Sequence, residues 1–301
     1  MSTATGQTQQ WIERRERGQI ITIRLLVFIA LSLGRRVARA LLYPVCAYYL
    51  LFSSASKRAS RTYLARVLRR PSSIADVFRH YFHFATCVLD RVFLLNDQID
   101  MFDLKIEGED IVIDLLERRT GCLLFGAHLG SFEVLRALGR RQRDLRVSLV
   151  MYEDNARKIN SVLNAINPKL STDIVSLGRP GAMIEIAQRL DAGHFVGVLA
   201  DRSLSEEEQD RLPFLGAPAP FPVGPFRMAA LLKRPVVLMV ALYRGGRRYD
   251  IHFERLYEPS NFSGDEKAQA VRKAMARYVA RIEHYCEIAP YNWFNFYDFW
   301  R

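Results

Sequence analysis

Short runs of apolar residues alternate with segments of helical periodicity through the second half of the chain. Six runs have the length of a strand: 122–127, 146–151, 173–177, 195–200, 235–243 and 249–256. Helical spacing separates the earlier runs, over 131–141, 155–166 and 180–192. Unbroken apolar strands alternating with helices are typical of a mostly parallel sheet with helices on both faces. We therefore expect an α/β fold, with the last two strands as a hairpin at one edge of the sheet.

Two longer helices are expected on either side of this pattern. Apolar residues recur at helical spacing through 72–95, and 265–288 is amphipathic and is followed by an aromatic tail at 290–300. His80 and His83 lie one turn apart in the first of these helices. Because no nearby acid or cysteine completes a ligand set, we interpret them as helix-surface or satisfied core residues and predict no metal site.

The N-terminal region holds the two most apolar segments. Residues 18–34 contain one charge, Arg24, and residues 40–56 contain none. Each segment would form a helix roughly 25 Å long, the short end for a membrane span. We predict that residues 1–70 are a basic, membrane-associated helical segment, either one span or a shallow hairpin, and that 71–301 form the α/β domain. Two buried core helices are the alternative, because short apolar runs are ambiguous.

Charge is distributed unevenly along the chain. Residues 1–70 hold thirteen Lys and Arg but two acids, so they carry the whole net charge of +11, and residues 71–301 are neutral. A nucleic-acid enzyme would more often spread basic groups along a groove of its folded domain. Basic groups beside apolar segments instead favour an anionic membrane surface as the partner.

The four cysteines show neither a Cys-x-x-Cys pair nor regular spacing. This pattern argues against a disulfide framework or a zinc site and favours a reduced, cytoplasmic domain.

One histidine directly follows the apolar run 122–127. His128 stands five positions before Glu133, with Gly130 and Ser131 between them. Ligands bind beyond the C-terminal ends of parallel strands. A neutral imidazole there can take a proton from an alcohol near pH 7, and a carboxylate on its other nitrogen would orient it. We therefore predict that His128 is a general base oriented by Glu133, across a turn that Gly130 permits.

The sequence of this turn also bears on which group is the nucleophile. Ser131 does not lie in the Gly-x-Ser-x-Gly elbow of esterases, so the substrate is expected to bring its own hydroxyl as the nucleophile. A hydrogen-bonded turn histidine beside a helix-terminal acid remains the alternative on spacing alone.

The motif HLGSFE resembles the first motif, H-x4-D/E, of the lysophospholipid acyltransferase superfamily. Its glutamate form is similar to the bacterial lipid A late (lauroyl/myristoyl) acyltransferase branch. The segments 193–203, 212–244 and 290–300 resemble later motifs of that branch in the same order. The chain has Arg202 where the branch has glutamine, and in such departures it resembles the variants found with aryl polyene biosynthesis genes.

The resemblance implies an acyltransferase at the cytoplasmic face of the bacterial inner membrane. It would move a fatty acyl group from an acyl-carrier-protein or CoA thioester to a hydroxyl of a lipid or glycolipid, without an acyl-enzyme, a metal or a cofactor. His128 and Glu133 would be catalytic. The residues expected to bind substrate are Gly130, Ser131, Arg157, Asp201 and Arg202. A glycerolipid acyltransferase that makes phosphatidic acid and an inactive membrane scaffold of the same fold remain alternatives.

Overall fold

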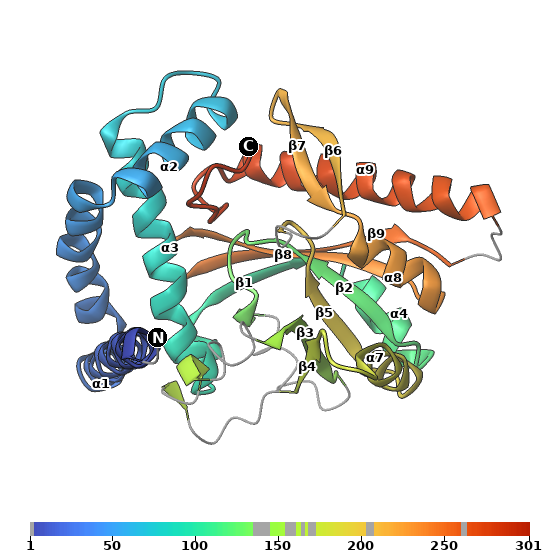
Figure 1. The fold of residues 1–301 in the computed structure, drawn as a ribbon, viewed down its shortest axis with the longest axis horizontal. Helices are drawn as coiled ribbons and strands as arrows, with labels where there is room; N and C mark the ends of the chain where they lie inside the picture. Colours follow the sequence, from blue (N-terminus) through green and yellow to red (C-terminus); the bar gives the residue numbers. More distant parts are fainter. Residues whose placement is uncertain are drawn as a thin grey trace.

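The computed structural model describes residues 3–134, 145–153, 161–163, 166–167, 173–202, 208–259 and 264–301, with the backbone alone for 3–26 and 264. The helices are α1 Thr3–Phe52, α2 Ser54–Val67, α3 Ile74–Leu95, α4 Glu109–Glu117, α7 Ala182–Asp191, α8 Gly224–Leu232 and α9 Gly264–Ile288, with a 3₁₀ turn at Ile99–Met101. The strands are β1 Asp103–Glu107, β2 Cys122–Gly126, β3 Val147–Tyr152, β4 Ile174–Leu177, β5 Phe195–Leu199, β6 Gln209–Phe214, β7 Ala217–Pro222, β8 Val236–Gly245 and β9 Arg248–Tyr257. Figure 1 shows their arrangement.

The main sheet has seven strands in the order β1-β9-β8-β2-β5-β3-β4. Neighbouring strands are parallel except for the antiparallel pair β8–β9. The predicted α/β fold with a mostly parallel sheet is therefore confirmed. The predicted edge hairpin is wrong in one respect, because β1 pairs with the outer side of β9 and forms the edge.

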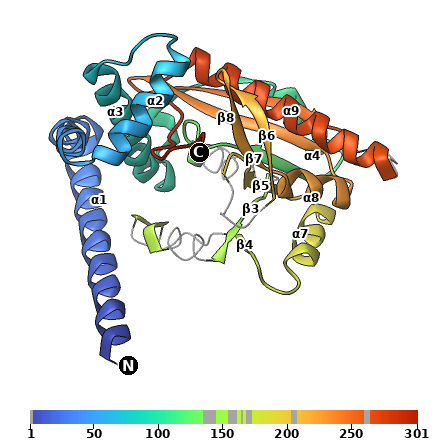
Figure 2. The same cartoon turned by 45° about the horizontal axis from the view of Figure 1, so that its top comes forward.

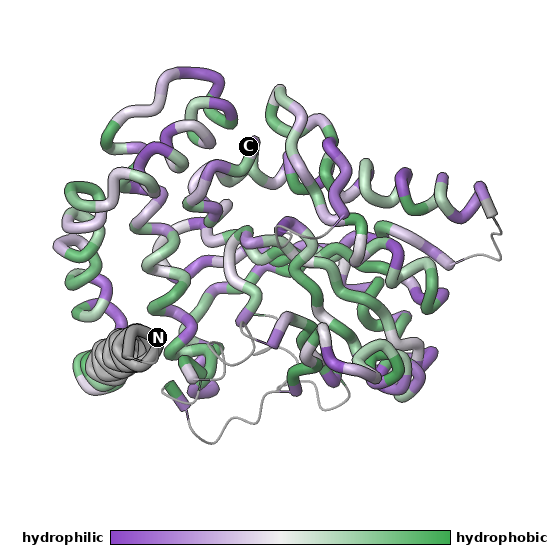
Figure 3. The backbone as a smooth tube through the Cα atoms, viewed as in Figure 1, coloured by the Kyte–Doolittle hydropathy of each residue, from purple (hydrophilic) through white to green (hydrophobic). Residues whose placement is uncertain are grey.

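Helices cover both faces of the centre of the sheet. On one face, Phe125 of β2 contacts Phe226 of α8 and Tyr278 of α9, with ring centroids 5.1 and 6.4 Å apart. Side chains alternate between faces along a strand, so Tyr243 of β8 points the other way, and His83 of α3 packs against it at 5.0 Å. β2 is buried along its whole length, and Figure 3 shows the central strands as hydrophobic. This burial fixes the positions at which β2 and its neighbours end.

The start of α3 is fixed by a capping box. Ser73 Oγ accepts a hydrogen bond from the Asp76 N–H at 3.1 Å, and Asp76 Oδ2 accepts one from the Ser73 N–H at 2.8 Å. Arg70 and the hydroxyl of Tyr291 also bond to Asp76, and these bonds hold the pKa of its carboxyl well below its usual range although burial opposes them. Tyr291 begins the aromatic tail, so the same carboxylate joins the tail to α3.

The helix α1 bends at Gly34, which has φ 81° and ψ 166°. Its first part projects away from the sheet (Figure 2), whereas its later part packs against α3. Arg35 makes a two-pronged ion pair with the fully buried Asp90 of α3, at 2.6 and 2.8 Å, and Tyr249 donates a further hydrogen bond to Asp90. Ala38, Leu42 and Cys46 continue the buried stripe. One face of this helix therefore belongs to the core.

Much of the remaining surface of α1 is apolar and exposed. Its large exposed side chains are Phe28, Leu31, Leu33, Val37, Leu41, Tyr43, Val45, Tyr48, Tyr49, Leu51 and Phe52. We call these eleven residues the outer face. Within the described part of the chain, no single helix is long and apolar enough to cross a membrane, but 27–52 and 54–67 together reach that length and composition, with a bend of 97° between them.

Candidate active site

The ends of two neighbouring strands bring His128 and Asp201 together. β2 and β5 are paired in parallel, with Gly126 opposite Leu199. The Ala200 N–H donates to the Gly126 carbonyl at 3.0 Å, which extends the pairing to the point where both chains leave the sheet. His128 lies two residues beyond β2, and Asp201 lies two residues beyond β5. The site therefore occupies the position that open α/β sheets use for ligands.

Asp201 holds His128 through two hydrogen bonds. Its Oδ1 lies 2.8 Å from Nδ1 of the imidazole, and its Oδ2 accepts the backbone N–H of His128 at 3.0 Å. The carboxylate is fully buried, whereas the His128 side chain is 30% exposed. Burial alone would raise the pKa of Asp201, but the charge and hydrogen bonds of His128 and the charge of Arg202 lower it to about 2. Asp201 is therefore ionised at neutral pH and favours the tautomer with hydrogen on Nδ1.

Glu133 does not occupy the predicted position against His128. Its Oε1 lies 2.9 Å from Nε of Arg91 on α3, and the acceptor beside Nδ1 of His128 is Asp201. The predicted contact between Glu133 and His128 is therefore wrong. The reason is geometric, because the first helical turn after Ser131 directs Glu133 toward α3 while the buried end of β5 lies directly beside the turn.

Gly130 makes the turn possible. Its φ is 71°, and a Cβ at this position would lie 1.9 Å from the Ala241 carbonyl oxygen of β8. The Gly130 N–H donates to the Asn292 carbonyl and the Ser131 N–H donates to the Ala241 carbonyl, both at 2.9 Å. Gly130 is thus required by the close approach of two other segments.

These bonds limit the groups that could stabilise an oxyanion. The N–H groups of His128, Gly130 and Ser131 all have protein partners. Arg202, which we expected to contact substrate, bonds to the tail: its Nε donates to Asn295 and its Nη2 donates to the Phe294 carbonyl at 2.7 Å. The backbone N–H groups of 132–134 stand at the start of the next helix, where N–H groups lack intrahelical partners, so they are candidate donors.

The aromatic tail, which we did not assign to the site from the sequence, surrounds this turn. Phe294 donates its N–H to the His128 carbonyl at 2.7 Å. The Asn295 side-chain amide and the Trp293 indole N–H both donate to Oδ2 of Asp201, at 3.2 and 3.3 Å. The signal in the sequence is the presence of two asparagines, Asn292 and Asn295, within an aromatic segment. Buried amides need partners, and here those partners are Asp201 for Asn295 and the Tyr243 N–H of β8 for Asn292.

Comparison with known proteins identifies the family. Residues 18–301 match the family described as bacterial lipid A biosynthesis acyltransferase. The chain belongs to this family. Its members are acyltransferases that act on lipid. A search of curated proteins found no match to the chain.

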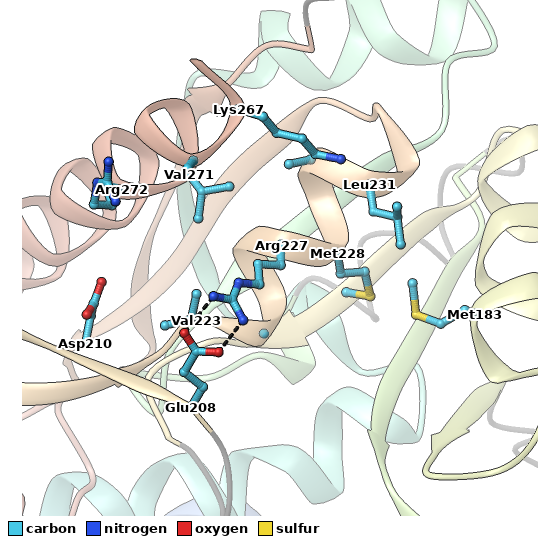
Figure 4. A pocket seen from close by; sticks show the side chains of 13 residues that line it. Met183, Glu208, Asp210, Val223, Arg227, Met228, Leu231, Lys267, Val271 and Arg272 are labelled. Atoms are coloured by element: carbon cyan, nitrogen blue, oxygen red, sulfur yellow. Dashed lines mark hydrogen bonds and ion pairs between the residues drawn. The ribbon is translucent and has the colours of Figure 1, made fainter. Parts of the chain in front are cut away.

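One cavity bounded by described residues lies away from the pair formed by His128 and Asp201. That cavity, of about 720 Å³, lies between α8, α9 and the start of β6, with Met183 at its side (Figure 4). Arg227 pairs with Glu208 at its mouth, and neither His128 nor Asp201 borders it. Arg157, a further candidate from the sequence, lies outside the described residues.

Proposed function

We propose that the protein transfers a fatty acyl group from a carrier-protein or CoA thioester to a hydroxyl of a membrane lipid or glycolipid. His128 is the general base and Asp201 is the carboxylate that orients it. The observation that carries the proposal is the pairing of a partly exposed imidazole with a fully buried, ionised carboxylate at the ends of β2 and β5. No described residue pairs with Nε2 of His128, so this nitrogen can accept a substrate proton.

The chemistry then proceeds in two steps. The acceptor hydroxyl attacks the thioester carbonyl as Nε2 of His128 takes its proton, and Asp201 stabilises the imidazolium that forms. The carbon–sulfur bond then breaks, and the imidazolium returns the proton to the leaving thiolate. The products are an ester and a free thiol. Donors at the start of the helix, in 132–134, would stabilise the negative charge on the carbonyl oxygen.

Direct transfer is favoured because no nucleophilic side chain is positioned by His128. The Ser131 hydroxyl is buried and has no hydrogen-bond partner among the described residues. All four cysteines are buried, and burial raises the pKa of the Cys122 thiol in β2. Within the described residues, none of these groups bonds to the imidazole, whereas an acyl-enzyme mechanism needs a nucleophile held by its base.

Glu133 has a supporting role in this proposal. It lies in the first helical turn after the His128 loop, and its ion pair with Arg91 joins this turn to α3. The carboxylate is 13% exposed, so the pair is shielded from solvent more than a surface salt bridge. It would hold the start of the helix, and with it the donors of 132–134, in place.

The outer face of α1 supports association with a membrane. Eleven large apolar side chains are exposed along α1, three before the bend at Gly34 and eight after it, and exposed apolar surface is typical of an interaction site. Arg36, between them in sequence, is exposed as well. A basic and apolar helix of this kind binds the interface of an anionic bilayer, so residues 1–70 would hold the domain 71–301 at the inner membrane, on its cytoplasmic face.

The test is acyl transfer by the purified full-length protein in detergent. Labelled acyl-carrier-protein and acyl-CoA thioesters are offered with a bacterial lipid extract, and both lipid acylation and thiol release are measured. We expect lipid acylation that falls about 10²–10⁴-fold in His128→Ala, as for loss of a general base. Thiol release without lipid acylation would indicate a thioesterase, and no turnover with either donor would favour the scaffold alternative.

A further inference from the structure

Three donors hold one oxygen of Asp201 and leave the other for His128. Oδ2 accepts the His128 backbone N–H, the Asn295 amide and the Trp293 indole N–H. Oδ1 faces Nδ1 of the imidazole. Fixing Oδ2 fixes the plane of the carboxylate, and the plane decides whether Oδ1 is aligned with the imidazole N–H. The rate of proton transfer falls steeply when the base is not aligned with the group that gives up the proton.

Trp293 is fixed independently by its backbone and its ring. Its neighbours in the chain pair with the catalytic turn through Asn292 and Phe294. Its fully buried ring packs against Tyr63, Phe214 and Phe299, with centroids 4.7 to 5.1 Å apart. The indole therefore cannot turn away from Asp201 without moving several aromatic residues.

The carbonyl of Trp293 is held from the helical side by a buried histidine. Nε2 of His80 lies 2.8 Å from this carbonyl oxygen, and Nδ1 of His80 lies 2.8 Å from the Ser60 hydroxyl of α2. A carbonyl can only accept, so Nε2 carries the hydrogen and Nδ1 accepts from Ser60. Burial lowers the pKa of His80 to about 4, although the bond to Trp293 opposes this, so the ring is neutral at pH 7. The interpretation of His80 as a satisfied core residue is confirmed.

We propose that Trp293 is a positioning residue for acyl transfer, which aligns Asp201 with His128 and is itself held in place by His80. A continuous series of contacts then joins Ser60 on α2, His80 on α3, Trp293 in the tail, Asp201 after β5 and His128 after β2. This inference rests on the proposed acyl transfer, because the alignment matters only if His128 acts as a base.

The competing explanation is that Trp293 is a packing residue alone. The chain offers a matched control in Trp300, which contacts Phe214 and Trp293 in the same aromatic cluster. Its indole N–H donates to the Phe214 carbonyl at 3.2 Å instead of to a catalytic group. Trp293→Phe and Trp300→Phe each remove one indole N–H and keep an aromatic ring, and only the first removes a donor to Asp201.

The experiment measures kcat, KM for donor and acceptor, and the melting temperature of full-length variants in detergent. We expect Trp293→Phe to lower kcat about tenfold with KM changed less than about twofold, as for loss of a hydrogen bond to a charged group. Trp300→Phe should keep kcat within about twofold at a similar loss of melting temperature. Equal kcat values for the two variants would overturn the proposal.

A second pair of variants, at His80, tests whether the contact between α3 and Trp293 affects turnover. This pair also tests the proposal if Trp293→Phe does not fold. Glutamine can place an N–H where Nε2 of His80 lies, whereas phenylalanine fills the space without a donor. We expect His80→Phe to lower kcat about tenfold and His80→Gln to restore most of it. If His80→Phe turns over like the wild type, or His80→Gln is no better than His80→Phe, the proposal is wrong. Wild type and His128→Ala are assayed alongside, so a failure of acyl transfer itself is seen separately as absent wild-type turnover.

Discussion

The turn that carries His128 and the outer face of α1 differ in how their side chains are satisfied. Around the turn, the backbone N–H groups of His128, Gly130 and Ser131 donate to Asp201, the tail and β8, and the carboxylate of Asp201 also has partners. On the outer face, every large apolar side chain is at least 42% exposed, although Tyr43 also packs against Phe78 and Phe82 of α3. Leu51 and Phe52 are 70% and 72% exposed. The polar groups of the first region are satisfied within the protein, whereas the second region leaves apolar surface exposed, which is the surface that we propose binds a membrane.

This contrast indicates that chemistry and location are separable in this protein. His128 and Asp201 follow the ends of β2 and β5, and the tail bonds to Asp201. None of the outer-face residues contributes a hydrogen bond to this pair. Substitutions around His128 should alter turnover without altering membrane binding. Substitutions on the outer face should alter membrane binding without altering turnover. The predictions below test this separation, in order of decreasing expected effect.

The largest effect is expected from the carboxylate beside His128. Asp201→Asn replaces the ionised acceptor with an amide and favours the wrong imidazole tautomer, so kcat should fall on the order of 10²–10⁴-fold. Glu133→Gln weakens an ion pair with Arg91 instead, and we expect a loss of about tenfold or less. Both are measured in detergent with vesicle binding as the control. A larger loss in Glu133→Gln than in Asp201→Asn would restore Glu133 as the catalytic carboxylate.

The elements that the sequence predicted correctly are those whose residues determine their structure locally. The six predicted runs became strands. β2, β5 and β8 are buried along most of their length, as continuous apolar sequence predicts, whereas β9 alternates buried and partly exposed positions. β1 was missed because its side chains are exposed or half-buried in alternation, and it gains its place only by pairing with β9. The β6–β7 hairpin was missed because Pro213, Pro218, Pro220 and Pro222 argue against strands.

In the candidate site, too, the sequence predicted features that are local and missed contacts between distant segments. His128 and Gly130 were predictable, because the base, the strand end and the turn lie within nine residues of sequence. The contact with Asp201 depends on β5 lying next to β2, which follows from the order of the whole sheet. The contacts of Trp293 and Asn295 depend on where α9 ends, because this position determines which strands the tail can reach. Periodicity predicts elements, and it carries no information on which elements become neighbours.

The second prediction concerns the outer face. Leu51→Glu with Phe52→Glu should weaken binding to anionic vesicles about tenfold or more, because each apolar side chain contributes about 1.5–3 kcal/mol when buried. Turnover in detergent should be unchanged. Flotation with vesicles measures the first quantity, and the control is Gln269→Glu with Ala280→Glu, which adds the same charge at exposed positions of α9. Equal binding by the two double variants would show that charge alone matters.

Point variants are preferable to deletion of α1. Removing the helix would take away Arg35 and leave the buried carboxylate of Asp90 without its cation. An unpaired buried charge destabilises a protein by several kcal/mol. Loss of activity after such a deletion would therefore report on stability, and not on the membrane.

The third prediction concerns the pH dependence of stability and the buried His80, which contacts Ser60 of α2 and the Trp293 carbonyl of the tail. Its folded pKa of about 4 is below the ordinary value of 6.5, so the unfolded chain binds more protons between these values and stability falls as pH is lowered through that window. One such group costs up to about 1.4 kcal/mol per pH unit. Burial also lowers the pKa of the neighbouring His83 to about 4, so part of the slope remains without His80. Free energies of unfolding at pH 7 and pH 5 should differ less in His80→Gln than in the wild type, and identical differences would contradict the assignment.

The smallest effect is expected at Ser131, inside the turn itself. Its hydroxyl is buried and has no partner in the part of the chain that the structure describes. Its backbone N–H donates to the Ala241 carbonyl and so contributes to the turn. Ser131→Ala removes a buried polar group without leaving a partner unpaired, so stability should stay equal or rise slightly. Turnover should remain within about threefold, because a base with a free nitrogen needs no serine to pass the proton. The measurement is kcat together with mass spectrometry of the intact protein during turnover. A loss comparable to that in His128→Ala, or an acyl group found on Ser131, would replace direct transfer with an acyl-enzyme and make the hydroxyl the nucleophile.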